Sequence, residues 1–263
     1  MVNPNNILPN HNFSIFIRSE MIRTKIFSAA EPTRQFLGLI DIIVLTTIFF
    51  GLAIYQSTQS FLELHQAGQA IATDLGFSAN NNYWDIGFEV VSLAVAGGYL
   101  LWRQFDFSQL DFRFNRYTLP LAVLFGVSAD MVAGSYDFIH NLIRPITEQE
   151  VTESASGQGI TPTWIAYALL NGFYEELFFL GLMFCVPKRY YSWIIAYSLL
   201  VRFSFHTYQG LESAIVITGL GVVFLIYRWR VSALLPFMLA HAFFDITGYG
   251  ATSYRILQYL WGE

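Results

Sequence analysis

Six ionisable side chains lie within three apolar stretches of the sequence, where such groups are uncommon. They are Glu175, Glu176, Arg202, His206, His241 and Asp245. Carboxylates and imidazoles together are suited to activating water. One of them accepts a proton from the water molecule, while a second imidazole donates to the oxyanion that develops. These residue types therefore predict a hydrolytic site, provided that the fold brings them together.

The spacing of the later residues places them in pairs. Arg202 and His206 are four residues apart, as are His241 and Asp245. Side chains four residues apart lie one above the other on the same face of a helix. Each pair therefore presents both of its groups to the same neighbour, as a shared site requires.

Helix geometry also predicts how deep these groups lie. At a rise of about 1.5 Å per residue, Glu175 lies roughly 14 Å, His241 roughly 15 Å and His206 roughly 20 Å from the same end of the bundle. Helix ends shift these depths slightly, so the three can share one layer near the middle of a bilayer. Glu175 and Glu176 point about 100° apart. We expect one of them to face the common centre and the other to face a neighbouring helix.

Three further carboxylates are interpreted as structural. Asp41, Glu89 and Asp130 lie nearer the ends of their apolar stretches, where a carboxylate commonly packs at an interface or between helices. A single intramembrane histidine likewise often serves as a hydrogen-bonding group between helices. The prediction of chemistry therefore rests on the six residues together.

The elements that must position these residues are membrane-spanning helices, which need about 20 mainly apolar residues each. The candidate stretches are 36–55, 84–102, 117–134, 162–184, 193–208, 213–228 and 231–248. A shorter piece, 251–261, would make an eighth. We predict an all-α, polytopic membrane helix bundle of about seven transmembrane helices. A cytoplasmic segment, 1–35, precedes this single domain at 36–263, whose motif-bearing half is 160–250.

The composition supports a membrane protein. Hydrophobic residues make up 54% of the 263 residues and charged residues only 13%, whereas soluble domains carry about 25% charged residues. The expected partners are the lipid bilayer and a protein or peptide substrate in or near it. A net charge of −5 gives no basic surface for nucleic acid. The single cysteine, Cys185, excludes an intrachain disulfide framework and a multi-cysteine metal site.

Charged residues and tryptophans predict the orientation. Cytoplasmic loops collect Lys and Arg, and most of the 14 basic residues fall in 1–35 or in loops that alternate spans place on the same side. The opposite loops are mainly acidic. All six tryptophans lie near the end of a stretch, where an amphipathic ring prefers the headgroup level. We expect a multi-pass integral membrane protein with a cytoplasmic N-terminus and no cleaved signal peptide.

Three motifs resemble those of a known family. They are Glu-Glu-Leu-Phe-Phe-Leu-Gly at 175–181, Arg-Phe-Ser-Phe-His-Thr-Tyr-Gln-Gly at 202–210 and His-Ala-Phe-Phe-Asp at 241–245. In order and spacing this set resembles the CAAX-protease and bacteriocin-processing family of intramembrane endopeptidases, also called the type II CAAX prenyl protease family. The resemblance covers about 160–250 and implies hydrolysis of a peptide bond within or beside the membrane.

The resemblance also implies roles for the residues. Glu175 and His206 would activate the attacking water, while His241 and Asp245 would bind the oxyanion. If the protein were a metalloenzyme, Glu175, His206 and His241 would hold Zn²⁺. The sequence has no HExxH motif, and the site can work without a metal, so we favour water activated by glutamate and histidine with no required cofactor.

Two positions depart from the family pattern. Leu180 stands where the family has arginine, and Arg202 stands where it has phenylalanine. In antiparallel helices both positions lie one turn from a reactive group, Glu176 or His206, in the direction of the cytoplasm. We therefore expect Arg202 to supply, from the neighbouring helix, the cation that pairs with the second glutamate.

Two other functions compete with the protease. A non-catalytic membrane scaffold of the same fold would explain the departure at Leu180, but not the intact set of ionisable residues. A proton-coupled transporter also uses intramembrane His and Glu. Transporters, however, commonly show internal repeats and helices broken near the site, and the sequence shows no repeat.

Overall fold

The computed structural model describes residues 36–67, 79–143, 161–248 and 251–261. The predicted N-terminal segment 1–35 lies outside the described residues. The main helices are α2 (Leu39–Ala67), α3 (Ala79–Trp102), α4 (Thr118–Ile143), α6 (Pro162–Glu176), α7 (Tyr191–His206), α8 (Leu211–Arg228), α9 (Leu235–Thr247) and α10 (Ala251–Trp261). The short elements are η1 (Phe107–Gln109), η2 (Leu177–Gly181), η3 (Leu182–Cys185), η4 (Lys188–Tyr190) and η5 (Thr207–Gln209). Within the described residues the fold is all-helical, as predicted.

Five helical segments are long and apolar enough to cross a membrane. They are Leu39–Glu63, Asn82–Trp102, Thr118–Ile143, Pro162–Cys185 and Leu211–Arg228. All seven predicted stretches are helical, but α7 has 16 residues and α9 has 13, fewer than the roughly 20 that a free-standing span requires. The prediction of a polytopic helical membrane bundle is confirmed, with five full-length spans in the described part instead of seven.

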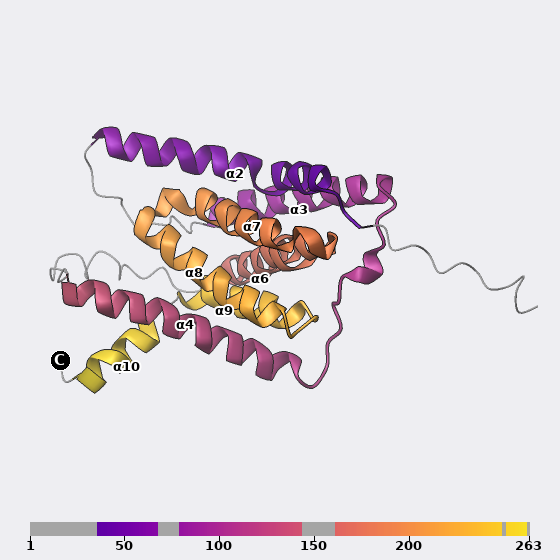
Figure 1. The fold of residues 1–263 in the computed structure, drawn as a ribbon. Coiled ribbons are helices and arrows are strands. Elements are labelled where there is room, and N and C mark those ends of the chain that lie inside the picture. Colours follow the sequence, from indigo (N-terminus) through magenta and orange to yellow (C-terminus); the bar gives the residue numbers. More distant parts are fainter. Residues whose placement is uncertain (1–35, 68–78, 144–160, 249–250, 262–263) are drawn as a thin grey trace, which may run out of the picture. The chain divides into compact units, whose positions relative to one another are not determined.

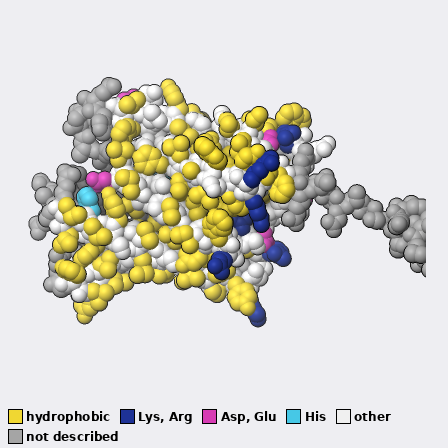
Figure 2. Space-filling view, viewed as in Figure 1, with side chains coloured by type: hydrophobic (Ala, Val, Ile, Leu, Met, Phe, Trp, Pro, Cys, Tyr) yellow, Lys and Arg dark blue, Asp and Glu magenta, His cyan; other side chains and the backbone are white. Residues whose placement is uncertain are grey.

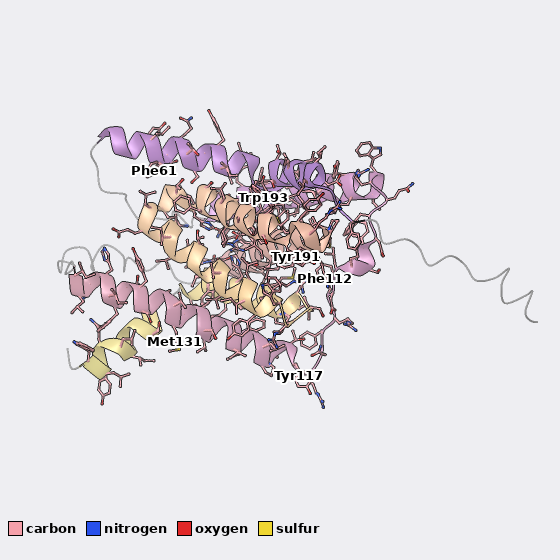
Figure 3. All side chains as sticks on the ribbon, in the orientation of Figure 1. Phe61, Phe112, Tyr117, Met131, Tyr191 and Trp193 are labelled. Carbon is pink, nitrogen blue, oxygen red and sulfur yellow. The ribbon has the colours of Figure 1, made fainter. Side chains whose placement is uncertain are left out.

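The surface matches a membrane environment. Hydrophobic side chains cover the middle of the face shown in Figure 2, while lysines and arginines gather at one end. Figure 3 shows side chains on both sides of the helices, and of those it labels, Met131 on α4 and Trp193 on α7 are 57% and 75% exposed. Such side chains are stable in contact with lipid.

Two helices extend beyond the stretches predicted for them. The sequence predicts spanning helices over 36–55 and 117–134, but α2 continues to Ala67 and α4 to Ile143. The added turns are more polar, so hydropathy does not detect them, although the backbone continues its helical hydrogen bonds. The stretches 56–83 and 135–161, which look like soluble loops in the sequence, are therefore partly helical.

Seven of the helices pack in a closed cycle. α6 packs on α9, α9 on α4, α4 on α8, α8 on α7, α7 on α2, α2 on α3, and α3 again on α6. In Figure 1, α2 and α4 flank the other helices, and α10 lies against α4. This cycle brings α6, α7 and α9, which carry the six ionisable residues, into one neighbourhood.

An aromatic cluster fixes α6 to α2 and α7. The ring of Phe50 lies 5.0 Å from that of Phe178 and 4.7 Å from that of Phe205, measured between centroids. The Tyr174 hydroxyl donates a hydrogen bond of 2.5 Å to the carbonyl of Phe49. Because Tyr174 immediately precedes Glu175, this contact fixes the helix turn that carries the first glutamate.

The loop between α3 and α4 holds the start of α9. The backbone N–H of Leu234 donates to the Asp111 carbonyl at 2.8 Å, and the Ser232 hydroxyl donates to the Asp111 carboxylate at 2.9 Å. The Arg113 side chain donates hydrogen bonds to the same carboxylate and holds the pKa of Asp111 below its usual value. This anchor positions α9, which carries His241 and Asp245.

The backbones of α6 and α9 approach each other closely at Gly172. A Cβ atom there would lie 2.6 Å from the carbonyl oxygen of Met238 and 2.8 Å from the backbone nitrogen of Ala242. Neither backbone atom can move without disturbing α9, so only glycine fits this contact. The contact therefore fixes the position of the glutamate pair on α6 relative to His241.

We predict that Gly172→Ala lowers the free energy of unfolding by about 1–3 kcal/mol, because the added methyl group overpacks a rigid backbone contact. Thermal unfolding of the purified protein in detergent measures this loss. Gly98→Ala on α3 is the matched control, since a Cβ there would meet nothing within 4 Å. An equal loss in both variants would contradict the proposed role of the close contact.

Candidate active site

Arg202 joins two adjacent carboxylates of α6. Its guanidinium lies 3.2 Å from Glu175 Oε2 through Nη1 and 2.9 Å from Glu176 Oε1 through Nη2. The three side chains are almost completely buried. Two neighbouring carboxylates in such an environment would repel each other and lose hydration, and one guanidinium with a planar set of donors offsets both effects.

The space for this guanidinium comes from α8 and η2. A Cβ atom at Gly221 would lie 2.8 Å from Arg202 Cδ and 3.0 Å from Arg202 Nε. On another side, the guanidinium carbon lies 4.2 Å from the centroid of the Phe179 ring, a cation–π contact. The arginine is therefore held along its length by a glycine gap and an aromatic face.

Glu176 also positions His241. The imidazole Nδ1–H donates to Glu176 Oε1 at 2.6 Å, so one carboxylate oxygen receives hydrogen bonds from both α7 and α9. The other oxygen, Oε2, is buried without a hydrogen-bond partner. The bond at Nδ1 fixes the imidazole ring and leaves Nε2 directed towards Glu175 Oε2, at 3.9 Å, and Asp245 Oδ1, at 3.6 Å.

Asp245 is held by two residues of α6. The side-chain amide of Asn171 donates to Asp245 Oδ2 at 2.8 Å, and the indole N–H of Trp164 donates to the Asp245 backbone carbonyl, also at 2.8 Å. Asp245 Oδ1 remains directed towards His241. The last turn of α9 is thereby fixed against α6 at the level of the glutamate pair.

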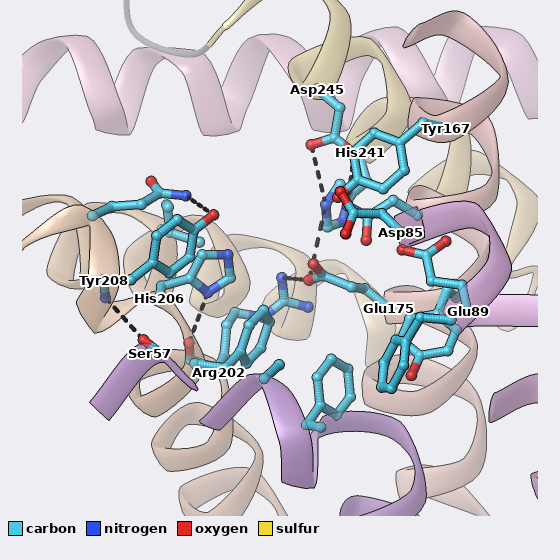
Figure 4. Close-up of a pocket in the computed structure, with 18 of the residues that line it drawn as sticks. Ser57, Asp85, Glu89, Tyr167, Glu175, Arg202, His206, Tyr208, His241 and Asp245 are labelled. Carbon is cyan, nitrogen blue, oxygen red and sulfur yellow. Dashed lines mark hydrogen bonds and ion pairs between the residues drawn. The ribbon is translucent and has the colours of Figure 1, made fainter. Parts of the chain in front are cut away.

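His206 is oriented by its own helix. Its Nδ1 lies 2.8 Å from the backbone carbonyl of Arg202. A carbonyl oxygen only accepts, so Nδ1 carries the proton and Nε2 is left as an acceptor. In Figure 4, His206 stands across from Glu175 and His241, with Arg202 below and between them. His206 therefore presents a basic nitrogen from the opposite side of the site.

These side chains border a cavity of about 1610 Å³. Its lining comes from α2, α3, α6, α7, η5, α8 and α9. Five of the six predicted residues contribute to it: Glu175, Arg202, His206, His241 and Asp245. Glu176 lies behind this wall, with no exposed surface. The expectation that only one glutamate faces the common centre agrees with this arrangement.

The helix that carries the glutamates changes its winding directly after them. α6 ends at Glu176, and Leu177–Gly181 forms a π-helical turn in which the N–H of Leu182 reaches the carbonyl of Leu177. Such wide turns are frequent at functional sites. A regular helix was expected through 162–184, and the wide turn departs from the regular winding between Glu176 and Leu180. Leu180 is buried, and its carbonyl accepts a hydrogen bond from Arg228.

The predicted pairing of Arg202 is confirmed by its two ion pairs. Glu175, Glu176, His241 and Asp245 form one connected network with it. His206 lies on the same cavity but is not part of the only group of three or more potential metal ligands among the described residues. That group is Glu175, Glu176 and His241, with ligand atoms within 4.8 Å of one another. It differs from the predicted zinc set, in which His206 stood in place of Glu176.

A resident zinc ion does not fit this group. The carboxylates of Glu175 and Glu176 already hold the Arg202 guanidinium, and His241 Nδ1 already donates to Glu176. A divalent cation placed among these three ligands would face strong repulsion from a guanidinium within a few ångströms. Charge neutralisation at this position is supplied by the protein itself.

Several residues of the site were missed by the sequence analysis. Asn171 lies one turn before Glu175 on the same helix face, a spacing that could have revealed it. Glu89, interpreted as structural, is buried and lines the cavity together with Asp85. The interpretation of Asp41 agrees with the structure, because its carboxylate binds Arg103 and Tyr99. No sequence signal identifies Gly221, because its importance depends on the position of Arg202.

Residues 157–247 match the family model described as type II CAAX prenyl endopeptidase Rce1-like. This segment includes α6, α7, α8 and α9 and all six ionisable residues. The segment is therefore similar to this family of endopeptidases, and the resemblance seen in the motifs is confirmed. No curated protein and no solved structure gave a significant match to the chain.

We predict that Arg202→Met lowers the free energy of unfolding by about 3–5 kcal/mol, because it leaves two buried carboxylates without their cation. Thermal or SDS-induced unfolding measures the change. Arg230→Met is the control, since Arg230 is exposed near the basic end.

A second pair of variants tests the position of the Arg202 side chain without changing its charge. Gly221→Ala pushes on the arginine but removes no charge, whereas a Cβ at Gly219 would meet only Val132 Cγ1, at 3.9 Å. Gly221→Ala should reproduce part of the loss and Gly219→Ala none of it. If the Arg202→Met and Arg230→Met proteins unfold alike, the bridging role of Arg202 is refuted.

Proposed function

We propose that this protein is an intramembrane endopeptidase that hydrolyses a peptide bond of a membrane-associated protein or peptide. The observation that carries the proposal is the arrangement of Glu175 and His206 on opposite sides of one cavity, with His241 and Asp245 beside Glu175. The match of this segment to a protease family supports it.

Glu175 and His206 are assigned to water activation. Glu175 lines the cavity, and the Nε2 atom of His206 is an acceptor because Nδ1 donates to the Arg202 carbonyl. A water molecule held between them would donate hydrogen bonds to the carboxylate and to the imidazole. As its oxygen attacks the peptide carbonyl carbon, its proton passes to one of these two acceptors.

His241 is assigned to the oxyanion. Because Nδ1 donates to Glu176, Nε2 carries a proton only when the ring is the imidazolium, and that second N–H is directed into the cavity beside Asp245. That N–H can donate to the carbonyl oxygen as it becomes negative. Asp245 can join as a donor only in its protonated form, and Asn171 holds it in place for either role. The proton taken up by Glu175 or His206 then passes to the leaving amine.

The orientation in the membrane follows from the charges at the two ends. Arg113, Arg116, Lys188, Arg189 and Arg230 are exposed at the end where α4, α7 and α9 begin. By the preference of cytoplasmic loops for basic residues, this end faces the cytoplasm. The start of α2 lies at the same end, which supports the proposal of a cytoplasmic N-terminus.

We predict that Glu175→Gln and His206→Ala each reduce peptide cleavage by a hundredfold or more, because general-base catalysis contributes about 10²–10⁴ in rate. The measurement is the initial rate of cleavage of a pool of internally quenched apolar peptides by protein in lipid nanodiscs. Glu63→Gln, an exposed carboxylate on α2, is the matched control. A non-catalytic scaffold or a transporter would give no cleavage with the unaltered protein, and that result would refute the proposal.

We further predict that cleavage survives removal of metal ions, because Arg202 occupies the cation position between the carboxylates. Protein treated with a strong chelator and then desalted should cleave at an unchanged rate and contain less than stoichiometric zinc by elemental analysis. Loss of cleavage that added Zn²⁺ restores would show that the reaction needs a metal.

A further inference from the structure

One face of α3 brings polar side chains to the cavity. Asn82, Asp85 and Glu89 are spaced three and four residues apart, so they share a helix face, and all three line the cavity. α3 packs against α6, which carries Tyr167, Asn171 and Glu175 along the opposing wall. Figure 4 shows Asp85 and Glu89 on the same side of the cavity as His241 and Asp245.

Glu89 is buried, and one of its two carboxylate oxygens lacks a hydrogen-bond partner. The residue is 5% exposed, and the oxygen without a partner is Oε2. Asn82, 1% exposed, likewise has no partner for either side-chain atom. Asp41 shows the contrast, because an arginine and a tyrosine bind its carboxylate. Burying a polar atom without a partner costs about 1–3 kcal/mol, so a polar ligand that bonds to these groups would be stabilised there.

The charges of the cavity define what that ligand carries. Asp85, Glu89, Glu175 and Asp245 line the cavity, and Arg202 is the one Lys or Arg among its lining residues in the described part of the chain. Arg202 is already committed to Glu175 and Glu176. Among the lining residues that the structure describes, no lysine or arginine therefore remains for the carboxyl groups on α3.

We propose that Glu89 and Asp85 form a subsite that binds a positively charged group of the substrate, a Lys or Arg side chain, close to the scissile bond. The subsite rests on the proposed protease function and names its substrate class, a peptide segment with a basic residue. A substrate that carried a carboxylate at this position would be repelled by Glu89 and Asp85. A metal ion is a poorer occupant, since neither residue belongs to a group of three potential metal ligands within the described residues.

The experiment measures binding separately from cleavage. Fluorescent apolar peptides that differ only at the central residue, Lys, norleucine or Glu, are titrated against His206→Ala protein in lipid nanodiscs at neutral pH. His206→Ala blocks the reaction without changing the carboxylates. The lysine peptide should bind at least tenfold more tightly than the norleucine peptide, and the glutamate peptide more weakly than both.

Adding Glu89→Gln should remove most of the lysine preference, and adding Asp85→Asn should reduce it. Both substitutions preserve side-chain size, and Glu63→Gln should leave the preference intact. Equal affinity for the lysine and norleucine peptides, or a preference that survives Glu89→Gln, would overturn the subsite.

The outcomes also separate the two proposals. A lysine preference in binding without cleavage by the unaltered protein would support the subsite and refute the protease. Equal binding of the three peptides, together with cleavage at the same rate whatever the central residue, would support the protease and refute the subsite.

Discussion

The structure of the site depends on one cation placed between two adjacent carboxylates. Glu175 and Glu176 are consecutive on α6, and burying both without compensation would be too costly for a stable fold. Arg202 makes this possible from α7, while Gly221 on α8 leaves the room and Phe179 on η2 provides an aromatic face. Four elements therefore meet around one guanidinium, and each of them is constrained by it.

Because of this arrangement, the two glutamates have different surroundings. Glu176 faces inward and accepts hydrogen bonds from Arg202 and His241, so it determines where both side chains stand. Glu175 keeps its place on the cavity wall and remains available to a water molecule. His206 lies outside the carboxylate network but is bonded to the carbonyl of Arg202. A shift of α7 would thus move the guanidinium and the basic nitrogen of His206 together.

The sequence predicted the members of this network because ionisable residues are uncommon within long apolar stretches. Spacing predicted the pair His241 and Asp245, but the single layer expected for Glu175, His206 and His241 did not predict that His206 lies outside the group of close ligand atoms. The π-helical turn after Glu176 was not predictable, because it depends on how residues 177–181 pack. The place of Glu89 on the cavity wall was not predicted, because proximity to a helix end does not show which side of a helix faces a cavity. The lengths of α2 and α4 were underestimated, because hydropathy does not follow a helix into its more polar last turns.

The acidic wall of α3 has a consequence for the chemistry. Attack on a peptide carbonyl creates a negative oxygen, and in a cavity that already holds Asp85, Glu89, Glu175 and Asp245 this charge is electrostatically unfavourable. In the proposed mechanism the imidazolium of His241 would stabilise this charge at short range, whereas Arg202 is neutralised by its own carboxylates. A positive charge brought by the substrate to Glu89 would reduce the excess of negative charge before the oxyanion forms. Substrate binding and transition-state stabilisation would then depend on the same cation, so that a peptide without it loses rate as well as affinity.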